Sequence, residues 1–200
     1  MGAQIITGYT GTRHITPAMD AAVYRSTFGA DNYILADGDQ LAGSMPSINQ
    51  FTILGGVASM QGHQIKVTQE TLSVDTCATG YSRIDLVALR FSHDSGTGVD
   101  SASLVVIKGT AVADPTTPSV PSYNIGTIDS GASTVDFPLY RINMAGSTVT
   151  YSPLAEIVGS PIESLNNLIV PLDISAGTGT LDGDLYAAID LQGWTSTVIE

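Results

Sequence analysis

The sequence predicts a mostly β protein, an antiparallel β-sandwich or barrel-like domain that follows one N-terminal helix. Short segments of apolar or alternating residues recur along the chain, separated by Gly, Pro, Asn and Asp. Charged residues make up only 13% of the chain, and Gly supplies 21 of 200 positions. We therefore expect a β-rich domain over residues 1–157, then a short helix and a C-terminal β hairpin over residues 158–200.

The first helix is predicted within "ITPAMDAAVYRSTFG" (15–29). Thr16 suits the N-cap, because its hydroxyl can accept a hydrogen bond from a backbone N–H of the first turn. Pro17 suits the first helical position, and Gly29 suits the end of the helix. The spacing of apolar side chains predicts a buried stripe formed by Met19, Ala22 and Val23.

The second predicted helix lies within "GSPIESLNNLIVP", where Ser160 and Glu163 have the spacing of a capping box and Pro171 ends the segment. It spans about two turns, too few to be stable alone, so its apolar face must pack on another element. The residues that follow predict the hairpin, with turns at 177–183 and at 192–193.

Strands are predicted between these two helices. "HQIKVTQ" alternates, with Ile65 and Val67 on one face. "FTILGGVASMQG" predicts two short strands broken at Gly55 and Gly56, and the Pro-rich segment 114–124 predicts an extended surface loop.

Two hairpins complete the predicted β domain. "RIDLVALRF" and "ASLVVIKG" predict strands joined by the polar loop "SHDSGTGVD". "DFPLYRINMAGSTVTYSPL" predicts a strand, a turn at Ala145 and Gly146, and a return strand, with Pro138 at a sheet edge or strand entry.

Charge and cysteine content exclude several classes of protein. The net charge is −12, and no Lys or Arg follows Arg141, so we expect no nucleic acid and no anionic membrane as partner. Cys77 is the only cysteine, which excludes an intrachain disulfide. No apolar run approaches the roughly 18 residues of a membrane helix. The first residues lack the features of a signal peptide, so we expect synthesis and assembly in a cytoplasm.

One motif suggests catalysis. Asp129 lies in "GTIDSGASTVDF", the local pattern of an aspartic protease, and Asp94 in "HDSGTG" gives a partial second copy. Asp-Ser-Gly is also a common turn signal in Gly- and Ser-rich β proteins, and the supporting apolar-Gly segment precedes Asp129 instead of following it. We favour the turn and keep an aspartic-type hydrolase as a remote alternative.

The sequence gives little support for a metal or a cofactor. Asp37 with Asp39, and Asp182 with Asp184, each flank a glycine but lack the remaining ligands of a calcium loop. The three histidines have no metal-binding spacing, and neither a phosphate loop nor a dinucleotide fingerprint is present. We expect no catalytic residues, no cofactor and no metal.

One aromatic cluster could bind a glycan. Trp194 lies close in sequence to Asp190 and Gln192 on the predicted C-terminal hairpin, and sugar rings stack on aromatic side chains that have carboxylates or amides nearby. Trp194 as a core residue is the favoured interpretation.

Several segments together resemble the N-terminal domain of tail-fibre or baseplate proteins from phages and prophages of Gram-positive bacteria. They are "IITGYTGTRHIT", "GGVASMQGHQIKV", "GYSRIDLVALRFSHDSGTGVDSASLVVIKGT" and "FPLYRINM…SPL", in this order over residues 5–157. The resemblance implies a structural virion protein, commonly a homotrimer, that docks to other tail or baseplate proteins and supports host attachment. It implies no catalytic residues. The alternative is a carbohydrate-binding module for host adhesion.

Charged residues inside the apolar strand "RIDLVALRF" require a reason. Alternation places Arg83 and Asp85 on the same strand face, close enough to pair. Because a buried charge must be paired or hydrogen-bonded, we expect this face to contact a partner subunit or to pack on a loop. Arg83, Asp85 and Arg90 are the candidate subunit or partner contacts, and a weak surface ion pair is the alternative.

Overall fold

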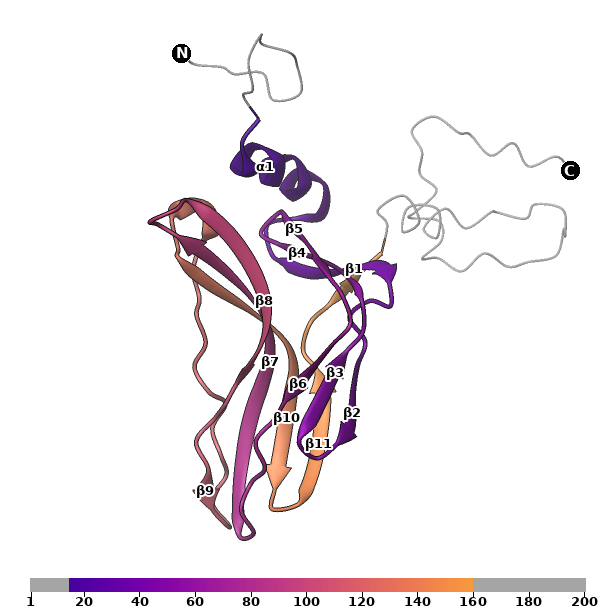
Figure 1. Ribbon diagram of the computed structural model, residues 1–200, viewed down its shortest axis with the longest axis vertical. Coiled ribbons are helices and arrows are strands. Elements are labelled where there is room, and N and C mark those ends of the chain that lie inside the picture. Colours follow the sequence, from indigo (N-terminus) through magenta and orange to yellow (C-terminus); the bar gives the residue numbers. More distant parts are fainter. Residues whose placement is uncertain (1–14, 160–200) are drawn as a thin grey trace, which may run out of the picture. The chain divides into compact units, whose positions relative to one another are not determined.

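The computed structural model describes residues 15–159, and these residues form one N-terminal helix, a 3-10 turn and three mostly antiparallel sheets (Figure 1). All of them belong to one compact unit, Met1–Ser164. The predicted mostly β fold with antiparallel sheets is confirmed, and no closed barrel forms within the described range. The second helix and the C-terminal hairpin lie outside the described residues.

The helix α1 (Pro17–Phe28) has the predicted ends. The Thr16 hydroxyl accepts a hydrogen bond from the Met19 N–H, and the Gly29 N–H donates to the Arg25 carbonyl. The predicted apolar stripe is wrong: Ala21 is the buried residue, whereas Val23 is 40% exposed. At residues 15–159 no helix is long and apolar enough to cross a membrane.

A close backbone approach explains which face of α1 is buried. Gly62, with φ of +88°, lies so near the helix that an added Cβ would be 2.2 Å from the Ala21 carbonyl oxygen. The face bearing Ala21 and Arg25 therefore packs on the turn before β5, and a larger apolar stripe has no room there.

The first sheet has the strand order β12-β1-β4-β5. Its strands are β1 (Asn32–Gly38), β4 (Gly56–Met60), β5 (His63–Val67) and the short β12 (Ile157–Val158), which pairs parallel to β1. The second sheet has the order β2-β3-β6, formed by β2 (Gly43–Ser47), β3 (Gln50–Ile53) and β6 (Glu70–Ser73). The predicted break at Gly55 separates β3 from β4, and Ile65 and Val67 share a face as predicted.

The third sheet contains the two predicted hairpins. Its main order is β11-β10-β7-β8, and Figure 1 shows β7 (Tyr81–Asp94) running beside β10 (Thr134–Ala145). The other strands are β8 (Val99–Ile107), β9 (Val112–Ala113) and β11 (Thr148–Pro153). Pairing extends to Asp94 and Val99, so the first hairpin loop is shorter than predicted. Residues 117–127 contain no regular secondary structure, in agreement with the predicted loop.

Pro138 is not at a strand entry, but β10 is a local sheet edge there, because the pairing of β10 with β11 begins only at Tyr140. It lies inside β10 opposite Ala88, and the register of β10 against β7 shifts between Pro138 and Tyr140. The residue that the bulge leaves out of this register is Leu139, and a proline is tolerated in a strand that has a partner on one side only.

The hydrophobic core contains residues of all three sheets. Phe51 of β3 is fully buried, and its ring lies 5.1 Å from Tyr140 of β10 and 5.3 Å from Tyr151 of β11. The Tyr140 hydroxyl accepts from the Gly43 N–H at 2.8 Å and donates to the Leu41 carbonyl at 3.0 Å. This side chain thus links the third sheet to the start of β2 through both packing and hydrogen bonds.

Candidate functional site

Arg83 and Asp85 form the predicted pair, and the pair is buried. The Asp85 carboxylate accepts from Nε and Nη2 of Arg83 at 2.8 and 2.9 Å, and the two side chains are 4% and 0% exposed. Both lie on β7, two residues apart, on the face that the β10 register places opposite Met144 and Ile142. The Arg83 Nη2 atom also lies 3.2 Å from the Met144 sulfur.

This pair holds two loops against β7. Arg83 donates to the Asp75 carbonyl in the segment after β6, and Asp85 accepts from the Gly109 N–H at 2.8 Å in the segment after β8. An added Cβ at Gly109 would lie 2.0 Å from the Ile84 carbonyl oxygen, so the chain can pass there only as glycine. Within the chain, Arg83 and Asp85 therefore pack on loops, which is one of the two expectations from the sequence. Their role in a subunit contact stays a prediction.

Arg90 pairs with a carboxylate that the sequence analysis did not single out. Its Nε and Nη2 atoms donate to Asp136 at 2.6 and 3.0 Å, and Asp136 also accepts from the Asn124 backbone N–H and side-chain amide at 2.9 and 2.7 Å. The Asp136 side chain is fully buried, whereas Arg90 is 32% exposed. The arrangement fastens the end of the Pro-rich loop to β10.

These contacts set the ionisation of both partners. Burial alone would raise the pKa of Asp136, but the hydrogen bonds from Arg90 and Asn124 outweigh it and bring that pKa below its usual value. The hydrogen bond to Asp136 in turn raises the pKa of Arg90. Asp136 is thus a carboxylate at neutral pH, held by hydrogen bonds from Arg90 and Asn124.

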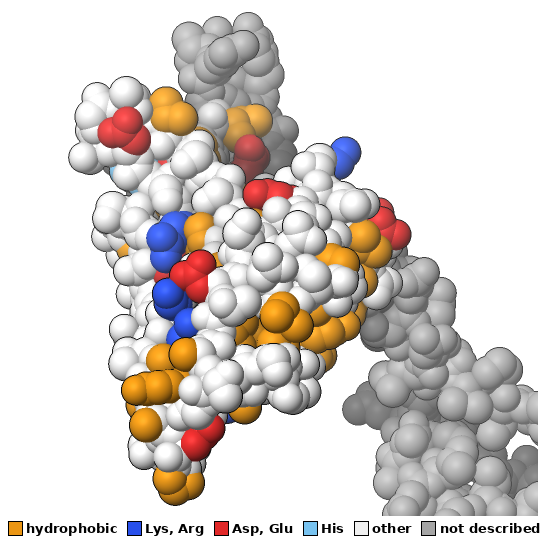
Figure 2. Space-filling model, turned by 60° about the horizontal axis from the view of Figure 1, so that its bottom comes forward, with side chains coloured by type: hydrophobic (Ala, Val, Ile, Leu, Met, Phe, Trp, Pro, Cys, Tyr) orange, Lys and Arg blue, Asp and Glu red, His pale blue; other side chains and the backbone are white. Residues whose placement is uncertain are grey.

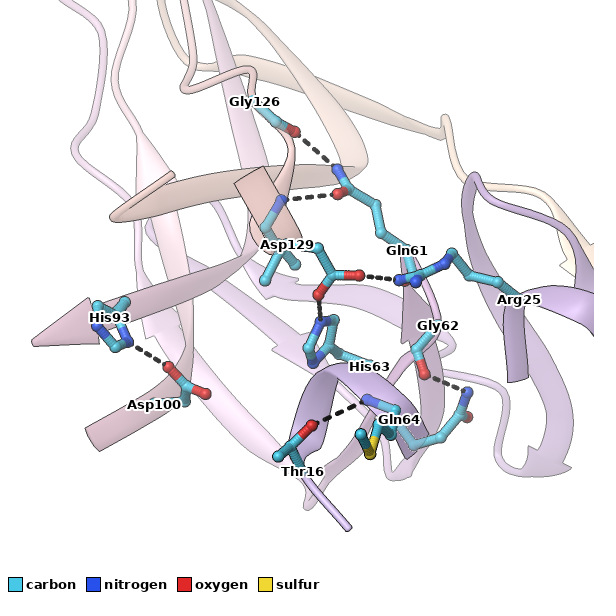
Figure 3. Close-up of polar contacts among 12 residues, drawn as sticks. Thr16, Arg25, Gln61, Gly62, His63, Gln64, His93, Asp100, Gly126 and Asp129 are labelled. Carbon is cyan, nitrogen blue, oxygen red and sulfur yellow. Dashed lines mark hydrogen bonds and ion pairs between the residues drawn. The ribbon is translucent and has the colours of Figure 1, made fainter. Parts of the chain in front are cut away.

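A second polar network surrounds Asp129, which lies in the 3-10 turn η1 (Ile128–Ser130). Figure 3 shows its carboxylate between the side chains of Arg25 and His63, with the His63 Nε2 atom at 3.1 Å. Burial would raise the pKa of Asp129, yet the hydrogen bonds from His63 and Arg25 lower it overall. Helix α1, strand β5 and turn η1 therefore meet at one carboxylate.

Gln61 reinforces this junction. Its side-chain amide donates to the Gly126 carbonyl at 2.7 Å and accepts from the Ile128 N–H at 2.9 Å, while its own carbonyl accepts from Arg25 at 3.0 Å (Figure 3). Gln61 has a φ of +51°, which places it in the tight turn before β5. The sequence carried no signal for Gln61 or for the His63 contact, because their partners are 36 to 67 residues away.

A surface pocket of about 350 Å³ adjoins this network. Its lining includes Asp129, His63, Phe91 and the pair formed by His93 and Asp100, whose Nδ1 and Oδ1 atoms lie 2.7 Å apart. Asp94 is not among the lining residues.

The contacts of Asp94 and Asp129 bear on the protease alternative. Hydrogen bonds from the Thr97 hydroxyl and the Gly96 N–H lower the pKa of Asp94, which turns the hairpin between β7 and β8. Both motifs are therefore turns, as the favoured interpretation predicted. The protease alternative stays a prediction, and it requires two such carboxylates to share one proton.

The remaining candidates are placed as follows. Asp37 and Asp39 lie at the turn that ends β1. Within residues 15–159, no group of three His, Cys, Asp or Glu side chains has the geometry of a metal site. Asp182, Asp184 and the glycan candidates Asp190, Gln192 and Trp194 lie outside the described residues.

The common feature of these contacts is that they join loops and turns to the scaffold. Of the six Lys and Arg side chains in residues 15–159, four pair with a carboxylate of that same range: Arg25, Arg83, Arg90 and Lys108. Chemically, the arrangement stabilises one conformation of the loops. Comparison of the chain with protein-family models and with curated proteins finds no match.

Proposed function

We propose that this chain is a structural component of a phage or prophage tail, acting as a baseplate or tail-fibre subunit that docks to other tail proteins and supports host attachment. The observation that carries the proposal is the use of scarce ionic side chains to fasten loops to a three-sheet scaffold, above all the Arg83–Asp85 pair. The ordered β segments that resemble tail-fibre and baseplate proteins support the same conclusion.

The surface also suits assembly. Figure 2 shows a face formed mainly by uncharged groups, with patches of apolar side chains and one short row of Lys and Arg beside an acidic residue. Several apolar side chains are at least half exposed, among them Ile125, Val99, Leu154 and Ile157. Apolar area that a partner covers is removed from water, which favours association. We propose a homotrimer that contacts its own copies and the tail through such uncharged areas.

A host-adhesion function through a glycan is a second candidate, favoured by one observation, a pocket of about 300 Å³ whose lining includes Arg141, Asn143 and Thr150. It is compatible with the first, because a tail subunit can also touch the host surface.

The test is to locate the chain in particles. Tailed particles are purified from the organism that encodes the chain, analysed by mass spectrometry, and labelled with gold-conjugated antibodies against residues 15–159. We expect peptides of the chain in the particles and label at one end of the tail. Particles that carry neither peptides nor label would overturn the proposal, and label confined to cell debris would do the same.

A further inference from the structure

One face of the third sheet carries a group of polar side chains near the free edge of β11. The register pairs Asn143 with Thr150 and Ala145 with Thr148, and residues directly opposite each other in a sheet point to the same face. Arg141 belongs to that face too, two residues before Asn143. Thr148 and Thr150 are exposed, whereas Arg141 and Asn143 are half-buried.

These side chains line a pocket of about 300 Å³ that is closed on one side by the Pro-rich loop. Thr117 and Pro118 supply that side. The pocket therefore combines hydroxyl and amide groups on strands, one guanidinium, and an apolar wall from a loop that Asn124 and Asp136 fasten at its far end. Side chains on paired strands hold their geometry before any ligand arrives.

Arg141 differs from the other described arginines. A terminal nitrogen of Arg25, Arg83 and Arg90 contacts a carboxylate in each case. Arg141 donates through Nε to the Asn143 side-chain oxygen at 2.7 Å, and its two terminal nitrogens donate to no acceptor within residues 15–159. The guanidinium is thus oriented by Asn143 and keeps two parallel donors, the group that binds a carboxylate in bidentate fashion.

The neighbours of Arg141 indicate what the carboxylate belongs to. Thr148, Thr150 and Thr117 can each donate and accept a hydrogen bond, which suits the hydroxyl groups of a sugar. Pro118 and Ala145 offer apolar contact for a sugar's C–H groups. A net charge of −12 repels a dense polyanion more strongly than a single carboxylate, because the repulsion grows with the number of charges on the ligand.

We propose that this pocket binds a carboxylated sugar of the hexuronic acid class, present as isolated units in an otherwise neutral glycan. Arg141 binds the carboxylate, and Asn143, Thr148 and Thr150 bind ring hydroxyls. The site is separate from the ion pairs Arg83–Asp85 and Arg90–Asp136 that hold the loops. The proposal stands even if the chain proves not to belong to a phage tail.

The test titrates the full chain with three small probes and monitors binding by the amide chemical shifts of the protein in NMR spectra. Glucuronate carries both the carboxylate and the hydroxyls, glucose carries only the hydroxyls, and acetate only the carboxylate. We expect saturable binding of glucuronate, with shifts at residues 141–150 and at Thr117, and clearly weaker binding of the other two. Arg141→Gln should weaken glucuronate binding by about tenfold or more, because a charge-assisted bidentate contact is lost.

Two variants act as controls. Thr150→Val removes one hydroxyl while keeping the side-chain shape, and should weaken glucuronate binding by about threefold. Lys66→Gln changes the net charge by the same amount as Arg141→Gln, but on β5, where Lys66 is exposed and has no carboxylate partner in the described range. It should leave the affinity unchanged. Circular dichroism checks that each variant is folded.

Three results would overturn the proposal. Equal affinity for glucuronate and acetate would mean a nonspecific anion site. Unchanged affinity in Arg141→Gln would exclude the guanidinium as the recognition group. If Arg141→Gln instead dissociated the oligomer, the carboxylate that fills the pocket would come from a neighbouring chain and not from a sugar.

Discussion

Asp85→Asn tests the role of the buried pair, because it removes the charge and keeps the size. An asparagine oxygen at the Oδ1 position can still accept from the Gly109 N–H and from Nε of Arg83, but its amide group then faces the Nη2 donor of Arg83. The Arg83 side chain is only 4% exposed, so water cannot replace the lost carboxylate. Removing one partner of a buried ion pair costs about 3–5 kcal/mol.

The assays are urea unfolding and thermal unfolding, each monitored by circular dichroism. We expect the free energy of unfolding to fall by about 4 kcal/mol and the melting temperature by roughly 10 °C. Lys108→Gln is the matched control, because Lys108 pairs with Asp75 at the surface, where the two side chains are 54% and 68% exposed. That variant should unfold like the unaltered chain.

A double variant separates two costs: the loss of the ion pair itself, and the burial of one charge without a partner. Arg83→Met with Asp85→Leu removes both charges and should lose less stability than Asp85→Asn alone, because no buried charge is left without a partner. A free energy of unfolding for Asp85→Asn within about 1 kcal/mol of the unaltered chain would refute the reasoning, because a buried arginine that loses its carboxylate should cost more than that.

Three further predictions follow from the fold. The pKa of Asp136 is lower in the folded chain, so its contribution to the free energy of unfolding is present above the unfolded pKa and is lost as the pH falls through the folded pKa. Stability should therefore drop below about pH 4, and it should drop less in Asp136→Asn. Equal acid sensitivity of the two proteins in urea titrations would contradict this. Gly62→Ala should displace α1, because the new Cβ meets the Ala21 carbonyl, and hydrogen exchange should then be faster in residues 17–28; unchanged exchange would count against the close approach. Tyr140→Phe leaves the Gly43 N–H without its acceptor and should cost about 1–3 kcal/mol in thermal unfolding, whereas an unaltered melting temperature would show that water replaces the hydroxyl.

Local signals in the sequence account for much of the fold. Thr16, Pro17 and Gly29 marked the ends of α1 correctly, because capping depends on residues adjacent in the chain. The two long hairpins were also predictable, since their apolar runs and turn residues are unusually clear.

Other elements depend on distant partners and were missed. Strand β2 contains Gly43 and Pro46 and has little strand propensity of its own; it forms at a sheet edge by pairing with β3. The burial of Ala21 instead of Val23 is set by a turn forty residues away. Period-two alternation found the Arg83–Asp85 pair, but not the Asn124–Asp136 or His63–Asp129 contacts, whose partners are brought together only by the tertiary fold.

The central proposal is that the paired charges of residues 15–159 secure loops of the chain itself, and that copies of the chain meet through uncharged surfaces. Sedimentation velocity in about 0.05 M and 1 M NaCl tests it most directly, because 1 M salt shortens the Debye length to about 3 Å and weakens exposed ion pairs. We predict a trimer of the same mass in both salts. A monomer at every concentration, or a trimer that dissociates at 1 M NaCl, would contradict the claim.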